Sequence, residues 1–423
     1  MIEARKTEVS ECRGRFDRTK THHLGWIAFL FGFSDSFLVY ILSSYFAEAI
    51  GGDNVSAFYF FAFGIIFAAL FFLHTGIRMA GGSLLFLLFL LVVVIVQIPL
   101  IFLPVSFGGS ALIMVYLIVT ALAWVVLDVL LERFSKDEYS GRIRGFHLSA
   151  INLGFLFAPF LAAFVLGRYG FSGIFFVSLV FYSVLFLVSL FFLFGSNVRF
   201  KKRAPLMEAF RNVLHRPDIL RIYAVSFALN FFYAAMIVYT SLRLRELGMA
   251  WDDIGIVFTV MLLPFVLVQY PLGIVADKRL GEKELLIGSI LLSALSTAAL
   301  AWIGSASVFV WASALFLTRV GIAGVEVLSD TYFYKRIEGN DGDLIAFFRT
   351  ARPMGNVAAA ILLGVWLLVF PLSNIFLVPA VVLLLALIPV FFLEDNLSEC
   401  DRELLMQRKL VSEASKHSRN TSF

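Results

Sequence analysis

About twelve apolar runs of membrane-spanning length follow one another along the chain, from Leu24 to Leu393, and short polar links separate them. A hydrocarbon core about 30 Å thick needs ~20 apolar residues in helical conformation to cross it. Each crossing must be a helix or part of a closed barrel, because lipid offers the backbone no hydrogen bonds. These runs are too long and too uniformly apolar for barrel strands. The sequence therefore predicts an all-α, polytopic membrane protein.

One long link divides the predicted spans into two sets of six. The sequence predicts an N-terminal segment (1–23), a six-helix bundle (24–195), a linker (196–219), a second six-helix bundle (220–393) and a C-terminal tail (394–423). The linker is basic, and Pro205 and Pro217 would bound an amphipathic helix on the inner membrane surface; a flexible tether is the alternative. The predicted spans are 24–50, 54–73, 82–103, 110–132, 146–168, 172–195, 220–247, 252–276, 284–304, 307–333, 344–370 and 372–393.

The distribution of basic residues predicts the orientation of the chain. Of 34 Lys and Arg, all except Arg168, Arg243, Arg245 and Arg319 lie before the first run, after the last, or at every second link. By the positive-inside rule these links are cytoplasmic, and so are both termini. We expect a multi-pass protein of a bacterial inner membrane.

Two carboxylate pairs occupy matching places in the two halves. Asp128 and Glu132 end the fourth predicted span, and Glu326 and Asp330 lie in the same part of the tenth. Residues four apart share one face of a helix. Two parallel copies of a six-helix unit would produce this pattern.

The stretch from Gly273 to Lys283 resembles a signature of the major facilitator superfamily, and the overall resemblance extends from about Leu24 to Leu393. The family has a span that ends in Gly-x-x-x-Asp, then basic residues and a second Gly. Gly273, Asp277, Lys278, Arg279 and Gly281 correspond to it, with one extra residue before Gly281. The resemblance implies a fold of twelve transmembrane helices and transport by alternating access.

Two weaker similarities lie elsewhere in the chain. Gly154 to Ala163 resembles the segment that the family's antiporters carry in the fifth span, with Ala in place of three Gly. Arg319-Val320-Gly321 resembles the start of the family's Arg-plus-glycine motif, here in the tenth span instead of the fourth. The first of these favours export.

Two charged residues lie deep inside predicted spans, where a charge costs several kcal/mol and indicates a functional site. Asp35 lies roughly 16 Å and Arg319 roughly 18 Å into its span, at ~1.5 Å per residue. In the family's fold, spans 1, 4, 7 and 10 line the central cavity, so the resemblance implies that both residues face it. Asp35 is the candidate proton or cation site. The alternative is an ion pair between Asp35 and Arg319 that braces the two halves.

The remaining charged candidates cluster near the cytoplasmic ends of spans. By resemblance they form a latch that closes the inner gate; the alternative is direct binding of substrate or protons, mainly through Asp128. The gate candidates are Gly273, Asp277, Lys278, Arg279, Gly281, Glu132, Glu326, Asp330, Arg349 and Arg352.

Several uncharged polar residues complete the predicted cavity, although a residue of this kind more often forms a hydrogen bond between helices than a contact with a ligand. They are Asn152, Asn230, Tyr233 and Gln269, with Ser34, Gln97 and Asn356. The sequence contains no recognisable metal cluster, phosphate-binding loop or nucleophile triad, so we expect no cofactor, no metal and no nucleic-acid partner.

These observations predict a secondary active transporter of small molecules, driven by a gradient because the chain has no ATP-binding domain. Proton-coupled export of amphipathic compounds is the leading hypothesis, and proton-coupled uptake of a small polar solute is the second. A cavity with several ordered polar contacts would favour uptake, and an aromatic one would favour export. A membrane enzyme for lipid-linked substrates and a receptor or scaffold are remote alternatives. We expect a monomer whose partners are lipid, substrate and protons.

Overall fold

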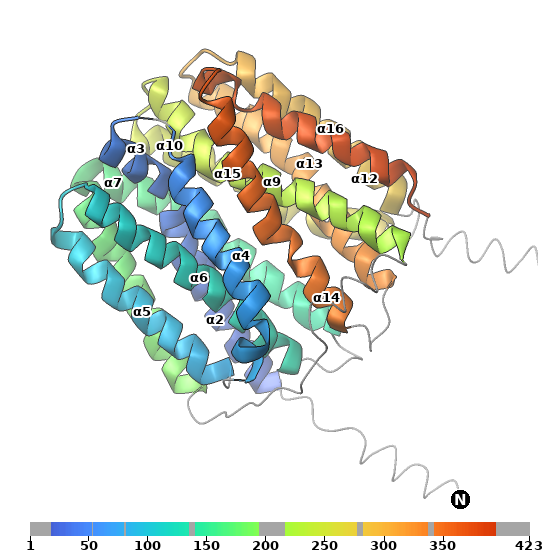
Figure 1. Ribbon diagram of the computed structural model, residues 1–423, viewed down its shortest axis with the longest axis horizontal. Helices are drawn as coiled ribbons and strands as arrows, with labels where there is room; N and C mark the ends of the chain where they lie inside the picture. Colours follow the sequence, from blue (N-terminus) through green and yellow to red (C-terminus); the bar gives the residue numbers. More distant parts are fainter. Residues whose placement is uncertain are drawn as a thin grey trace, which may run out of the picture. The chain divides into compact units, whose positions relative to one another are not determined.

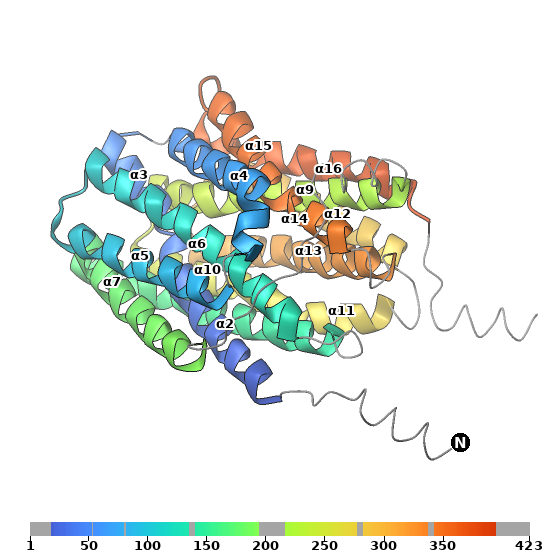
Figure 2. The same cartoon turned by 60° about the horizontal axis from the view of Figure 1, so that its bottom comes forward.

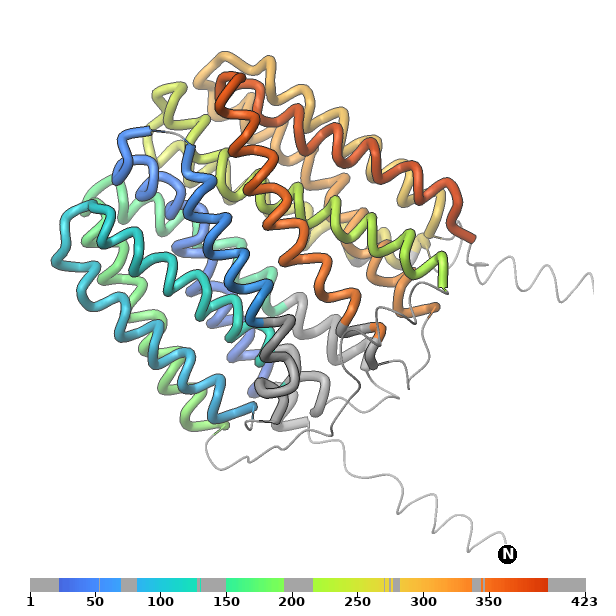
Figure 3. Tube along the Cα trace, in the orientation of Figure 1, coloured from blue at the N-terminus to red at the C-terminus, as the bar shows by residue number. Residues whose placement is uncertain are grey.

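The computed structural model describes residues 18–52, 54–79, 82–134, 140–193, 216–276, 282–336 and 342–394. Figure 3 traces the chain as a tube coloured from blue at the N-terminus to red at the C-terminus. The predicted amphipathic helix of the linker, most of the N-terminal segment and the tail beyond Glu394 lie outside the described residues.

The described residues form helices and no strand. Long uninterrupted helices are expected, because each apolar segment must satisfy its own backbone in lipid. Figure 1 labels all of the following helices except α11, which Figure 2 labels. In chain order they are α2 (Arg18–Val39), α3 (Leu42–Ile50), α4 (Ser56–Met79), α5 (Gly82–Phe102), α6 (Phe107–Phe134), α7 (Ser140–Leu193), α9 (Pro217–Glu246), α10 (Trp251–Leu267), α11 (Gln269–Val275), α12 (Glu282–Ala299), α13 (Val308–Lys335), α14 (Gly342–Arg349), α15 (Ala351–Trp366) and α16 (Leu377–Phe391).

Nine helical segments of the described chain are long and apolar enough to cross a membrane. One of them, 150–193, contains Gly170 in a non-helical conformation with φ 63° and ψ −165°. Glycine adopts this positive φ without a steric cost. Gly170 lies between the predicted spans 146–168 and 172–195, so this segment is two helices joined at a kink. The all-α, polytopic fold is confirmed, and the count of twelve stays a prediction.

The chain folds into two compact units. Unit 1 comprises Met1–Val39 and Ala68–Lys202, and unit 2 comprises Tyr40–Phe67 and Arg203–Phe423. The division passes through the first predicted span, where a turn at Tyr40 and Ile41 separates α2 from α3. The segment Tyr40–Phe67 therefore groups with the C-terminal helices, although it belongs to the N-terminal half of the sequence.

Unit 1 is organised around the packing of α2 on α7, with α5 against both α6 and α7 (Figure 2). Glycines allow the close approach of α2 and α7. A Cβ atom added to Gly154 would lie 2.5 Å from the carbonyl oxygen of Phe29. Gly32, on the facing helix, approaches the carbonyl oxygen of Ile151 in the same way. Such small residues at helix contacts are typical of membrane proteins.

Unit 2 has a similar contact between α9 and α15, in addition to those of α12 with α13 and α16, and α10 with α13. A Cβ atom on Gly355 of α15 would lie 2.7 Å from the carbonyl oxygen of Phe227 on α9. Gly321 of α13 lies equally close to Ser289 of α12. Glycine contacts thus set the helix spacing in both units.

Large apolar side chains are exposed along several helices. Leu84 on α5, Leu187 and Phe191 on α7, Leu295 on α12 and Phe391 on α16 are examples. A soluble protein would not expose so many of them. This surface is suited to contact with lipid tails.

Candidate transport site

Asp35 of α2 lies in a cluster of hydrogen-bonding aromatic residues in unit 1. Its Oδ2 accepts a hydrogen bond from the Trp124 indole nitrogen at 2.9 Å, and its Oδ1 accepts one from the Tyr116 hydroxyl at 3.3 Å. The Tyr116 hydroxyl also hydrogen-bonds that of Tyr182 at 2.8 Å. A carboxylate inside a membrane span needs such partners, because lipid supplies none.

Helix periodicity explains how α2 and α6 build this cluster. Tyr116 and Trp124 are eight residues apart on α6 and therefore share one helix face. The Trp124 ring stacks on Phe31, with the ring centroids 4.1 Å apart and the planes at 9°. Phe31 lies one turn before Asp35 on α2, so a single indole contacts two successive turns of that helix. The stack holds the indole nitrogen in place for its bond to Asp35.

Arg319 of α13 is buried in unit 2, with 2% of its surface exposed. Its Nη2 lies 3.8 Å from the Met261 sulfur, and its guanidinium carbon lies 5.0 Å from the centre of the Phe232 ring. Nε and Nη1 have no hydrogen-bond partner in the part of the chain that the structure describes. Asp35 belongs to unit 1 and Arg319 to unit 2, and the ion pair between them stays a prediction.

Glu326 lies two turns after Arg319 on α13 and is partly buried. Its Oε2 accepts a hydrogen bond from Gln269 Nε2 at 2.7 Å. The Tyr233 hydroxyl has both Glu326 and Arg319 among its charged neighbours. The structure thus places Glu326, a predicted gate residue, with two predicted cavity residues.

The other sequence-predicted residues are distributed more widely. Asn230 donates to the carbonyl of Ser226 on its own helix at 2.7 Å. Asp330 and Arg352 both interact electrostatically with Glu326, Arg352 being exposed. Asn152 and Arg349 are partly buried, and so is Gly273 on α11. Four gate residues, Asp277, Lys278, Arg279 and Gly281, lie outside the described residues, as do the side chains of Asp128 and Glu132.

The segment Tyr40–Phe67 makes polar contacts with the C-terminal helices inside unit 2. The Ser43 hydroxyl hydrogen-bonds that of Ser241 at 2.8 Å, and the Ser56 hydroxyl hydrogen-bonds that of Tyr239. Asn54 donates to the carbonyl oxygen of Gly364 at 3.2 Å. These contacts fasten α3 and the start of α4 to α9 and α15, at the end of the spans that the charge pattern predicts to be external.

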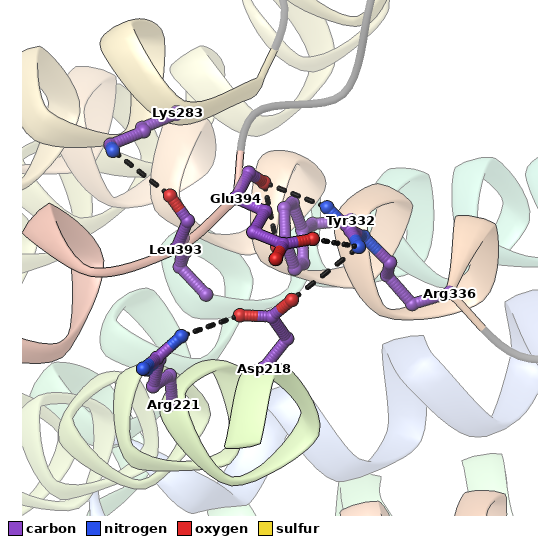
Figure 4. A network of polar contacts seen from close by, with 7 residues as sticks. All are labelled: Asp218, Arg221, Lys283, Tyr332, Arg336, Leu393 and Glu394. Atoms are coloured by element: carbon purple, nitrogen blue, oxygen red, sulfur yellow. Dashed lines mark hydrogen bonds and ion pairs between the residues drawn. The ribbon is translucent and has the colours of Figure 1, made fainter. Parts of the chain in front are cut away.

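A charged network joins helix ends in another part of unit 2 (Figure 4). Arg336 contacts Glu394 at 3.1 Å and Asp218 at 3.4 Å, and Asp218 also pairs with Arg221. Partial burial acts to lower the pKa of Arg336, but the Glu394 and Asp218 carboxylates raise it above its usual value. The network ties together the ends of α9, α13 and α16, which the charge pattern predicts to be cytoplasmic.

The aromatic residues around Asp35 were not predicted from the sequence. Tyr116, Trp124 and Tyr182 had a detectable signal, because they are hydrogen-bonding aromatics in spans that otherwise contain mainly Phe and aliphatic residues. The sequence signal for the contacts of Ser43, Ser56 and Ser241 was weaker, because single hydroxyl groups are common in membrane helices.

The described residues also line a pocket of about 620 Å³ between α10 and α13. Its walls are almost entirely apolar, with Ile256, Val260, Phe309 and Phe316 among them. The pocket involves neither Arg319 nor Glu326. We assign no transport role to it.

Membrane-spanning helices, two compact helical units and polar clusters within apolar spans define a multi-pass integral membrane protein of the transporter class. The family model of the Major Facilitator Superfamily matches residues 243–414. This part of the chain is similar to that superfamily, whose proteins are typically transporters. A search of curated proteins found no match.

Proposed function

We propose that the protein is a secondary active transporter that exports amphipathic small molecules in exchange for protons, by alternating access between its two helical halves. The observation that carries this proposal is the Asp35 carboxylate, which lies inside an apolar span and is bonded to Trp124 and Tyr116. A charge at such a depth is costly, so its presence requires a functional reason. Proton coupling needs a group that can change its charge during the cycle, and Asp35 is suited to that role.

Glu326 is the second carboxylate that could carry the proton. It lies within α13, and its hydrogen bond from Gln269 links α11 to α13. Its position beside Tyr233, near Arg319, supports a role in the cavity. In that case the latch near the cytoplasmic surface would depend on the other gate residues, chiefly Asp277 and its basic neighbours.

The aromatic surroundings of Asp35 favour an amphipathic substrate. Phe31, Trp124, Tyr116 and Tyr182 present apolar ring faces with few polar atoms. Export is further supported by the resemblance of Gly154–Ala163 to the antiporter segment, and Gly154 lies at a close contact between α2 and α7.

Proton-coupled uptake of a polar solute is the second candidate. The specific observation in its favour is the ordered polar contact between Gln269 and Glu326, with Tyr233 beside it.

Proteoliposomes with imposed gradients test the proposal. The purified protein should move amphipathic compounds against their gradient when a pH gradient is applied, and a sodium gradient of equal size should have no effect. Transport of sugars or amino acids instead would favour the uptake candidate. If no compound moves under either gradient, the proposal fails.

A further inference from the structure

We propose that Arg319 binds the charged group of a monovalent organic anion, a carboxylate with an apolar body. This inference rests on the proposed transport function and deepens it, because it gives the exported molecule a negative charge. The site consists of Arg319, Phe232, Met261, Tyr40 and Tyr233, all within unit 2.

The donors of Arg319 are the first observation. A guanidinium presents five N–H donors in a fixed fork. Nη2 has only the weak sulfur acceptor of Met261, at 3.8 Å, and Nε and Nη1 have no partner in the described chain. A buried cation without acceptors is strongly unfavourable. A carboxylate that binds to two of these nitrogens would satisfy both the charge and the donors.

The walls around the guanidinium are the second observation. The Phe232 ring lies 5.0 Å from its central carbon, and Tyr40 and Tyr233 are further neighbours. Phe232 and Tyr40 are both buried. These residues offer apolar surface next to the cation, which suits a ligand with an anionic head and an apolar body.

The balance of charge limits the ligand to a single negative charge. Arg319 supplies one positive charge, and the Glu326 carboxylate lies two turns along the same helix, about 10 Å away at ~1.5 Å per residue. A dianion such as phosphate would therefore meet one favourable and one unfavourable charge. A monocarboxylate matches the site better.

Tyr40 places this site at the junction between α2 and α3. Tyr40 packs on Phe258 of α10, with the ring centroids 5.2 Å apart, and it is the first residue of the segment Tyr40–Phe67, which Ser43 and Ser56 fasten to α9. The site is covered in this structure. An anion would enter when the contacts of this segment open.

Ligand-dependent unfolding of the purified full-length protein tests the proposal. The probes are octanoate, benzoate and 2-naphthoate, each compared with its neutral amide, together with acetate and inorganic phosphate. We expect at least one of the three larger carboxylates to raise the midpoint of thermal unfolding by several degrees. Its amide, acetate and phosphate should have little or no effect.

Variants assign the effect to Arg319. Arg319→Gln should abolish the stabilisation by the carboxylate. Arg168→Gln is the matched control, because Arg168 also lies over a phenylalanine ring, that of Phe164, but is exposed and belongs to unit 1. It should leave the stabilisation unchanged. If Arg319→Gln does not fold, Arg319→Lys keeps the charge but loses the bidentate fork, and it should weaken binding at least several-fold.

The outcomes separate this inference from the transport proposal. If no carboxylate stabilises the protein more than its amide, or if Arg319→Gln retains the effect, the anion site is wrong even when liposomes show proton-driven export. If a carboxylate binds through Arg319 but no gradient moves it or any other compound, the anion site stands and the transport proposal fails.

Discussion

The carboxylate of Asp35 accepts a hydrogen bond from the indole nitrogen of Trp124 at 2.9 Å, although 89 residues separate the two in the chain. Stacking of the same indole on Phe31 fixes its orientation. This hydrogen bond joins Asp35, a charged residue inside an apolar span, to the face of α6 that carries Tyr116 and Trp124. Several predictions depend on how these central charges are held.

Removal of the indole donor should reveal the charge state of Asp35. Trp124→Phe keeps a ring that can stack on Phe31 but deletes the N–H group. A hydrogen bond to a charged group contributes about 1.5–3 kcal/mol, and one between neutral groups about 0.5–1.5 kcal/mol. We expect the larger loss in the free energy of unfolding, measured by denaturant titration in detergent. Trp26→Phe is the control, because Trp26 is 63% exposed. A loss no greater than that of the control would show that the bond does not stabilise the fold.

Asp35→Asn should abolish transport driven by a pH gradient, because the amide keeps the size of the side chain but cannot titrate. Exchange of substrate down its own gradient should survive. Both are measured in proteoliposomes with protein shown to be folded. Gradient-driven transport at the wild-type rate by a well-folded Asp35→Asn protein would eliminate the proton-site hypothesis.

The alternative role of Asp35, as the counter-ion of Arg319, has a different signature. If the two residues pair, Asp35→Asn leaves a buried cation without a partner and should lower the free energy of unfolding by roughly 3–5 kcal/mol. Asp35→Asn combined with Arg319→Gln should then recover most of that loss. Additive losses in the double variant would argue against a pair.

Tyr239→Phe should weaken the contact that fastens α4 to α9. It deletes the hydroxyl that bonds Ser56, a hydrogen bond of the kind that contributes about 0.5–1.5 kcal/mol. We expect the segment Tyr40–Phe67 to open several-fold more often, measured as the labelling rate of a cysteine introduced at the buried Leu42, which leaves the Ser43–Ser241 bond intact. Tyr59→Phe is a close control, because the buried Tyr59 hydroxyl has no partner among the described residues. Equal labelling of the two variants would contradict a fastening role.

Gly154→Ala should destabilise the protein, because its new methyl group would lie 2.5 Å from the Phe29 carbonyl oxygen. Overpacking of this kind costs about 1–3 kcal/mol. Gly288→Ala is the matched control, because a Cβ atom added at Gly288 would have no neighbouring atom within 4 Å. It should be neutral or raise the free energy of unfolding by up to about 1 kcal/mol, because alanine is the better helix former. Thermal unfolding in detergent measures both, and equal effects would show that the close approach of α2 and α7 is not needed.

Reporter fusions test the orientation on which the predicted inner and outer ends depend. A reporter fused after Phe423 should report a cytoplasmic location, and one inserted at Gly108, at the start of α6, should report an external one. The reasoning is the charge asymmetry of the links. The reverse pattern would overturn the orientation.

The sequence by itself determined the helices and their membrane setting. Hydrophobicity summed over ~20 residues is a local property, and lipid leaves a helix as the only way for such a segment to satisfy its backbone. The same reasoning located Asp35 and Arg319 as exceptions within apolar spans. A local signal also predicted the break near Gly170, which the structure has between two helices of α7.

Only the tertiary structure decided which residues meet. Trp124 bonds Asp35, Gln269 bonds Glu326, and Tyr40–Phe67 groups with the C-terminal helices. These relationships depend on the rotation and spacing of packed helices, and close glycine contacts such as that of Gly154 set the spacing. Hydropathy contains little information about rotation, because nearly every face of these helices is apolar. For that reason the sequence predicted that Asp35 and Arg319 lie inside apolar spans, but it did not predict which residues they contact.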